Sequence, residues 1–152
     1  MSRRRKHDGK TASRERELSE QKEKERREES RSLGLVSHLK QEPGVVVEDD
    51  CSGPGFGDRM TVLRAERIRV RVIRDRSLWY VTISEDSQPH EWYYVEQIRE
   101  HLHGSKRAGA LMSIEEQANF VLQNWHRIED LFSKDRAKET HRALQPQTDE
   151  PH

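Results

Sequence analysis

The large apolar residues of this chain are concentrated in its middle. Nearly all of them lie between Val45 and Phe132, whereas residues 1–31 contain a single large aliphatic, Leu18, apart from the first methionine. A segment with so little apolar surface has nothing to bury and stays solvated. We therefore predict a charged arm over residues 1–41, a single α+β core over residues 42–133 and a disordered tail over residues 134–152.

The arm has the composition of a helix but not of a coiled coil. Residues 13–30 are mostly good helix formers, with glutamates interleaved among lysines and arginines at helical spacing. They lack the apolar a and d positions that a coiled coil needs. We expect a disordered or loosely helical segment, followed at residues 32–40 by an apolar cluster that is either a docking turn or a first small element of the core.

Alternation of apolar and polar residues predicts an antiparallel meander of three to four strands. Ile68, Val70 and Val72 alternate with arginines, and residues 78–84 repeat the pattern after a tight turn at residues 75–77. Residues 60–64 are expected to pair in front of this hairpin. Residues 45–47 are β-branched and form a possible fourth strand, before a solvated acidic loop at residues 48–50.

Beyond a turn at residues 85–90 the spacing becomes helical. Gly104 stands where a helix would end, and Tyr93 and Glu100 are expected to face outward. The apolar side of this helix carries Tyr94, Val95, Ile98 and Leu102. A second helix opens at Ser113 with a capping box and carries an apolar stripe as far as Phe132. The predicted fold is therefore an α+β meander followed by two helices.

Composition and charge narrow the range of partners. Charged residues make up 37% of the chain, yet the net charge is zero, so there is no overall field to attract nucleic acid or a membrane. The charge is nevertheless uneven, because residues 61–76 carry a net +4 and residues 77–104 a net −4. No long apolar run follows the basic start, so we expect neither secretion nor membrane spanning.

Motifs for catalysis or metal binding are missing from the sequence. Cys51 is the single cysteine, which excludes an intrachain disulfide and a thiolate zinc site, and favours a reducing, cytoplasmic location. The glycine-rich residues 53–57 lack the Gly-Lys-Ser/Thr of a phosphate loop, and His101 and His103 have the wrong helical spacing for a shared metal. We therefore expect no cofactor, no metal and no enzymatic activity.

The arginines of residues 67–71 are the most unusual local feature. On a strand they form a basic stripe on one face, suited to an acidic partner, unless the chain's own acids neutralise it. We predict a non-enzymatic protein-binding module, regulatory or otherwise. The expected partner-binding residues are Arg67, Arg69, Arg71, Tyr93, Glu96 and Glu100.

The alternative is a nucleic-acid-associated protein. In it, Arg3, Arg4, Arg5 and Lys6 of the arm act together with the arginine-rich strand on phosphates. Eight acids among the twelve bases of residues 1–31 weaken this interpretation, as does the lack of an aromatic residue for base stacking in the arm.

Five short sequences within residues 56–133 form a recognisable series: Arg74-Asp75-Arg76, Leu78-Trp79-Tyr80-Val81, Trp92-Tyr93, Ser113-Ile114-Glu115-Glu116-Gln117 and Ile128-Glu129-Asp130-Leu131-Phe132-Ser133. In these sequences and their order, residues 56–133 resemble a group of small, mostly uncharacterised bacterial α+β proteins. Proteins of this kind often include immunity proteins, which bind and block a toxin. The resemblance therefore implies a binding role and supplies no catalytic residues, and the long charged arm departs from it.

Overall fold

A computed structural model describes residues 2–52, 58–104 and 111–144 of the chain, and within these ranges it contains five strands and five helices. The strands are β1 (Val46–Ser52), β2 (Arg59–Arg64), β3 (Ile68–Asp75), β4 (Leu78–Glu85) and β5 (Gln88–Tyr94). The helices are α1 (Ser2–Lys40), α2 (Val95–His103), α3 (Ile114–Gln123), α4 (Trp125–Leu131) and α5 (Ala137–Ala143). The α+β class is confirmed, with more strands and helices than the sequence predicted.

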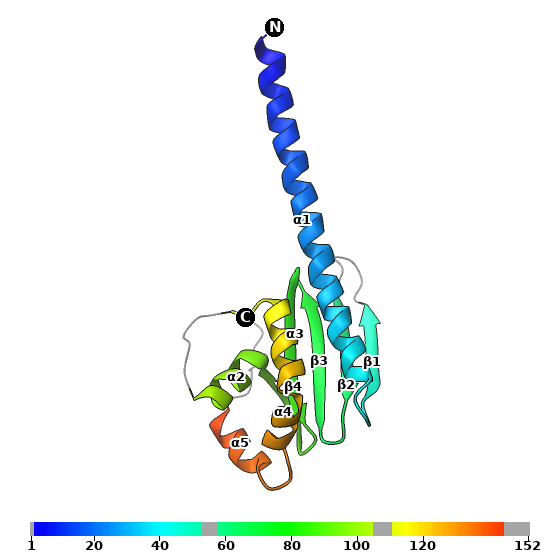
Figure 1. The fold of residues 1–152 in the computed structure, drawn as a ribbon, viewed down its shortest axis with the longest axis vertical. Coiled ribbons are helices and arrows are strands. Elements are labelled where there is room, and N and C mark those ends of the chain that lie inside the picture. Colours follow the sequence, from blue (N-terminus) through cyan, green and yellow to red (C-terminus); the bar gives the residue numbers. More distant parts are fainter. Residues whose placement is uncertain (1, 53–57, 105–110, 145–152) are drawn as a thin grey trace.

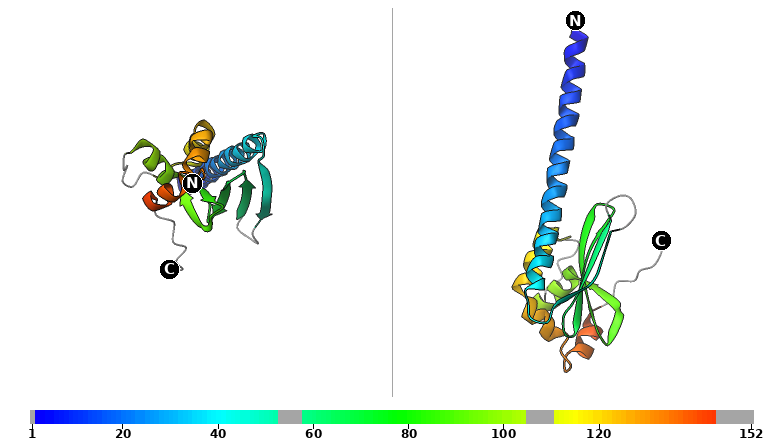
Figure 2. Two further views of the ribbon diagram at one scale, coloured as in Figure 1. Left: turned by 90° about the horizontal axis from the view of Figure 1, so that it is seen from below. Right: turned by 90° about the vertical axis from the view of Figure 1, so that its right-hand side faces the viewer.

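The strands form one antiparallel sheet in the order β1-β2-β3-β4-β5, so each strand pairs with its neighbour in sequence. Helices α1 and α3 lie side by side over one face of this sheet (Figure 1), with α4 on the same side (Figure 2). Val70, Val81 and Ile83 face these helices and are fully buried. The two-residue turn between β3 and β4 confirms the predicted hairpin.

The acidic residues 48–50 belong to β1 rather than to a loop. Pairing with β2 overrides their low strand propensity, and β1 is an edge strand whose residues 48–51 are all exposed, so the carboxylates stay hydrated. A bulge between Val47 and Asp49 interrupts the register. Charges and a bulge are two of the devices that protect a sheet edge from unwanted pairing.

The fifth strand replaces the start of the predicted helix. Gln88 pairs with Glu85 across a two-residue turn, and Tyr93 lies opposite Ile83. The expectation that Tyr93 faces outward is wrong, because its side chain is 0% exposed. Strand period two, not helical period, sets its direction, because β5 continues to Tyr94 and α2 begins only at Val95.

The ends of α2 and the start of α3 follow the sequence closely. Gly104 ends α2 with a φ of 68°, the left-handed conformation that glycine favours. Ser113 caps α3 by accepting a hydrogen bond from the Glu116 amide at 3.1 Å. The long helix predicted after Ser113 is divided at Asn124, whose side-chain amide donates to the Phe120 carbonyl at 2.9 Å and competes with the helical ladder.

Helix α1 is one continuous helix, and its last turns belong to the core. Leu35 and Leu39 are 1% and 0% exposed, so the boundary predicted at residue 41 is wrong. The apolar cluster at residues 32–40 continues the helix and covers β2. The N-terminal part of α1 projects away from the body (Figure 1).

Residues 137–143 form α5, although the sequence predicted a disordered tail from residue 134. The helix is fixed partly by polar contacts that hydropathy does not reveal. Thr140 is 2% exposed and donates to the Leu131 carbonyl at 2.6 Å. Residues 145–152 lie outside the described residues.

None of the described helices is both long enough and apolar enough to cross a membrane.

Candidate functional site

The face of the sheet opposite α1 and α3 carries a group of aromatic residues and arginines. Because Ile68, Val70 and Val72 face the helices, Arg69 and Arg71, which alternate with them, face the other way. Arg71 lies opposite Thr82, which in turn lies opposite Tyr94. The open face therefore gathers side chains from β3, β4 and β5.

Arg71 and Trp92 are the centre of this face. The guanidinium carbon of Arg71 lies 4.2 Å from the centre of the Trp92 ring, a cation–π geometry, and its Nε donates to the Thr82 hydroxyl at 3.1 Å. The rings of Tyr80 and Tyr94 lie 5.9 Å apart. We call Arg71, Tyr80, Trp92 and Tyr94 the aromatic patch; all four are partly exposed.

The other arginines of the open face are paired with acids of the same chain. Arg69 lies 2.9 Å from Glu48 of the edge strand, and Arg64 lies 3.6 Å from Asp86. These pairs neutralise much of the basic stripe that the sequence predicts. Arg69 in particular forms an ion pair with Glu48 of β1, across the intervening strand β2. Arg71 is the predicted residue that stands within the aromatic patch.

Arg67 is not part of this surface. Its Nε donates to the Phe132 carbonyl at 3.1 Å, and its Nη2 lies 3.3 Å from a Glu85 carboxylate oxygen. It precedes β3, so the strand alternation that orients Arg69 and Arg71 does not apply to it. The prediction of one stripe of three arginines is therefore wrong at Arg67.

The side chains of Glu85, Tyr93 and His141 form a buried polar network, which we call the buried network and which the exposed Ser87 joins at its edge. His141 Nε2 lies 3.0 Å from Glu85 Oε2, and its Nδ1 lies 2.5 Å from the Tyr93 hydroxyl. The Ser87 hydroxyl donates to the same Glu85 oxygen. Since an ionised carboxylate only accepts, Nε2 carries the hydrogen in this pair. The Tyr93 hydroxyl also donates to a Glu91 carboxylate oxygen at 3.2 Å.

Burial and hydrogen bonds have opposite effects on the acids of this network. Burial raises the pKa of Glu85, but the hydrogen bonds from Ser87 and His141 outweigh it and leave that pKa below its usual value. Burial, with the nearby Glu91 carboxylate, raises the pKa of Tyr93. Tyr93 therefore keeps its proton and remains a hydrogen-bond donor.

The buried network is not arranged for nucleophilic catalysis. A catalytic serine donates to a histidine that an acid orients, whereas Ser87 donates to Glu85 and the histidine lies on the far side of that carboxylate. The side chains of Glu85 and His141 are 0% and 6% exposed. The arrangement therefore joins α5 to β4 and β5 through side chains that are themselves buried.

The predicted acidic partners lie elsewhere. Glu96 of α2 accepts a hydrogen bond from the Met112 amide at 3.2 Å and so holds the chain leading into α3. Glu100 is partly exposed on the same helix, which packs on the covered side of the sheet through Val95 and Ile98. The structure therefore does not bring Glu96 and Glu100 together with Arg69 and Arg71.

The basic residues 3–6 occupy the first turns of α1, far along the helix from the body (Figure 1), and their side chains are outside the described residues. Across the part of the chain that the structure describes, no group of three or more histidine, cysteine or acidic side chains is placed to hold a metal ion.

Tyr80, Trp92 and Tyr94 were missed as site residues by sequence reasoning. The alternation from Gln88 to Tyr94 contained the information, because it places Trp92 and Tyr94 on one face once β5 is recognised. His141 had no comparable pattern, since it stands alone in a polar segment.

Comparison with known proteins adds no relative: no family model, no curated protein and no solved structure matches the chain.

Proposed function

We propose that this protein is a non-enzymatic protein-binding module whose contact surface is the aromatic patch. The observation that carries the proposal is the Arg71 guanidinium stacked 4.2 Å from Trp92, on the sheet face opposite the described helices α1 and α3. Tryptophan, tyrosine and arginine are the residues that most often dominate binding energy in protein interfaces. A patch built from these types, beside the Tyr80–Tyr94 pair, suits a protein partner.

The charges around the patch favour a protein over a nucleic acid. Arg69 and Arg64 are already paired with Glu48 and Asp86. The edge strand β1 adds exposed Asp49 and Asp50 to the same sheet. A phosphate backbone is bound by basic side chains that are not already paired with acids, and it is repelled by acidic side chains such as these. A protein surface of mixed charge can complement both the basic and the acidic side chains of this face. A regulatory or immunity-like role fits this surface and the resemblance of residues 56–133.

Removal of the Trp92 ring tests the proposal. Trp92→Ala is expected to weaken a protein complex at least about thirtyfold, because loss of a hot-spot side chain costs about 2 kcal/mol or more. The measurement is capture of a stoichiometric partner from nuclease-treated lysate of the source cell, followed by titration of the purified pair. Leu78→Ala is the matched control, since Leu78 is a 58% exposed apolar residue of β4 outside the patch.

Two outcomes would contradict the proposal. The first is a partner that binds Trp92→Ala and wild type equally well while both remain folded by circular dichroism. The second is binding that disappears on nuclease treatment and falls steeply with salt, which would assign the patch to single-stranded nucleic acid.

A further inference from the structure

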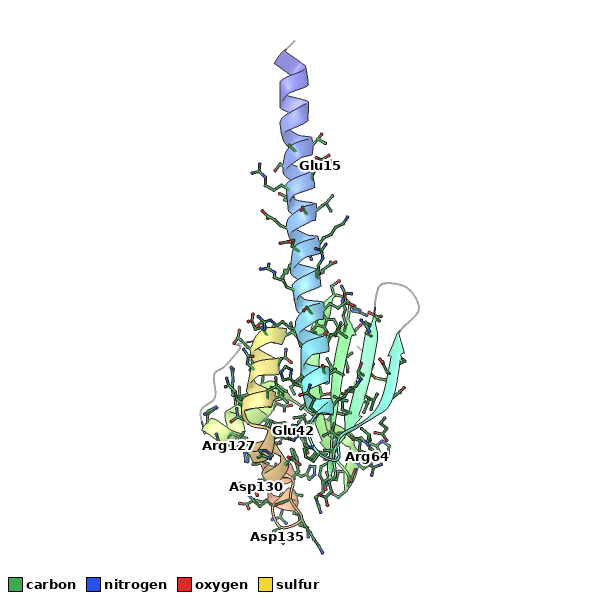
Figure 3. All side chains as sticks on the ribbon, turned by 45° about the vertical axis from the view of Figure 1, so that its right-hand side comes forward. Glu15, Glu42, Arg64, Arg127, Asp130 and Asp135 are labelled. Atoms are coloured by element: carbon green, nitrogen blue, oxygen red, sulfur yellow. The ribbon has the colours of Figure 1, made fainter. Side chains whose placement is uncertain are left out.

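One face of α1 has its charges segregated along the helix. Glu17 and Glu20 come first, and Lys24, Arg27 and Arg31 follow at spacings of three or four residues, which places all five on one face. All five are exposed. Figure 3 shows the side chains near Glu15 standing clear of the body.

This face continues into a groove between α1 and α3. The groove has a volume of about 920 Å³, and its lining includes Lys24, Arg27 and Gly34 of α1. Its apolar lining residues are Leu35, Ile114, Ala118 and Leu122. A side chain added at Gly34 would meet nothing within 4 Å, so the groove is open there. A second hollow along α1 shares Lys24 and Arg27 with the first and extends it to Glu17.

We propose that the charged face of α1 and the groove that continues it bind α1 of a second copy of the same chain. The two helices run antiparallel about a two-fold axis at the level of Lys22. In that arrangement Glu20 lies opposite Lys24 of the other copy, and Glu17 opposite Arg27. Each contact occurs twice, as a two-fold interface requires. Arg16 and Glu28 form a further opposite-charge pair in the same register.

The shape of the molecule is compatible with this antiparallel pairing. The body first forms an ion pair with α1 at Glu29, which lies 2.7 Å from Arg59. The paired segment from Glu17 to Arg27 spans about 15 Å, at about 1.5 Å per residue, and its C-terminal end reaches the groove that Lys24 and Arg27 line. The N-terminal turns of each α1 then lie along the groove of the other copy. A parallel pairing is disfavoured, because it would place Glu17 beside Glu17 and Arg27 beside Arg27.

Ion pairs between exposed side chains contribute little individually and are screened by salt. The groove adds limited apolar surface, because Leu35, Ile114 and Ala118 are already buried within one copy. The dimer is therefore weak, and its affinity rises as the salt concentration falls.

Charge reversal on the full chain tests the pairing by sedimentation velocity at low and high salt. Wild type is expected to dimerise with increasing concentration at about 20 mM salt, where the Debye length exceeds 20 Å, and to dissociate at about 0.5 M. The double variants Glu17→Lys/Glu20→Lys and Lys24→Glu/Arg27→Glu are each expected to be monomeric. An equimolar mixture of the two is expected to restore a dimer, since every reversed pair is again opposite in charge.

The control is Glu15→Lys/Arg26→Glu, which alters the opposite face of α1 and is expected to dimerise as wild type does. A wild type that stays monomeric at low salt overturns the proposal. So does a mixture of the reversed variants that stays monomeric while wild type dimerises. Because Trp92 lies on the other side of the sheet, Trp92→Ala is expected to leave the dimer intact, so failure of this inference and failure of the proposed function are separable.

Discussion

Glu85 has a fully buried carboxylate, and three groups compensate for its burial. Ser87 and His141 contact one oxygen, and Arg67 contacts the other. An unpaired charge in this position would be strongly destabilising. The buried network therefore stabilises the fold. Its disruption should change the free energy of unfolding rather than an activity.

We expect Glu85→Gln to lower the free energy of unfolding by about 1–3 kcal/mol near neutral pH, because buried donors lose their charged acceptor. The folded pKa of Glu85 lies below its unfolded value, so its contribution is present above the unfolded pKa and is lost as the pH falls through the folded pKa. The difference between variant and wild type should therefore shrink in acid. Urea unfolding across pH measures it, with Glu139→Gln on the exposed side of α5 as control. A difference that is independent of pH would contradict this role.

At the scale of elements, the β3–β4 hairpin contains avoidable strain. Arg76 and Ser77 have φ values of 51° and 67°, which side chains other than glycine adopt at a cost. Ser77 is exposed, so its side chain is dispensable for packing.

Ser77→Gly is expected to raise the free energy of unfolding by about 1 kcal/mol, because glycine adopts positive φ without the steric cost. Thermal unfolding of the purified variant measures the gain. Ser77→Ala, which removes the hydroxyl but keeps the Cβ, should show no gain; equal stabilisation by both variants would exclude backbone strain as the cause.

The elements that the sequence predicts correctly are those with a local signal. Alternation in β3 and β4, Gly104 after α2 and the Ser113 cap each act within a few residues. The elements missed depend on distant partners: β5 is fixed by pairing with β4, and the last turns of α1 by burial against β2. The same reason explains the site, because Arg71 was predicted from its strand, whereas its contact with Trp92 required β5 to be placed first.

At the scale of the whole molecule, the folding unit begins inside α1 rather than after it. Residues 11–23 are exposed, whereas Leu35 and Leu39 are buried against the sheet. Removal of residues 1–23 is therefore expected to leave the thermal midpoint of the monomer unchanged. Removal of residues 1–41 should unfold the protein, since loss of each buried leucine alone costs about 2–5 kcal/mol.

Circular dichroism melts of the two truncated chains, recorded in high salt where the proposed dimer is dissociated, distinguish these outcomes. Leu39→Ala in the full chain is the point test, with exposed Leu18→Ala as its control. If the chain that starts at residue 42 folds stably, α1 is not required for the folded core.

The projecting part of α1 also fixes the distance between its N-terminal turns and the body. Between Lys6 and Glu29, where the body begins, the helix spans roughly 35 Å at its usual rise per residue. The basic N-terminal turns and the aromatic patch are held apart by a stiff rod rather than joined by a slack tether. A single small ligand cannot touch both, so any partner that engages the two ends at once must itself be at least as long as the rod.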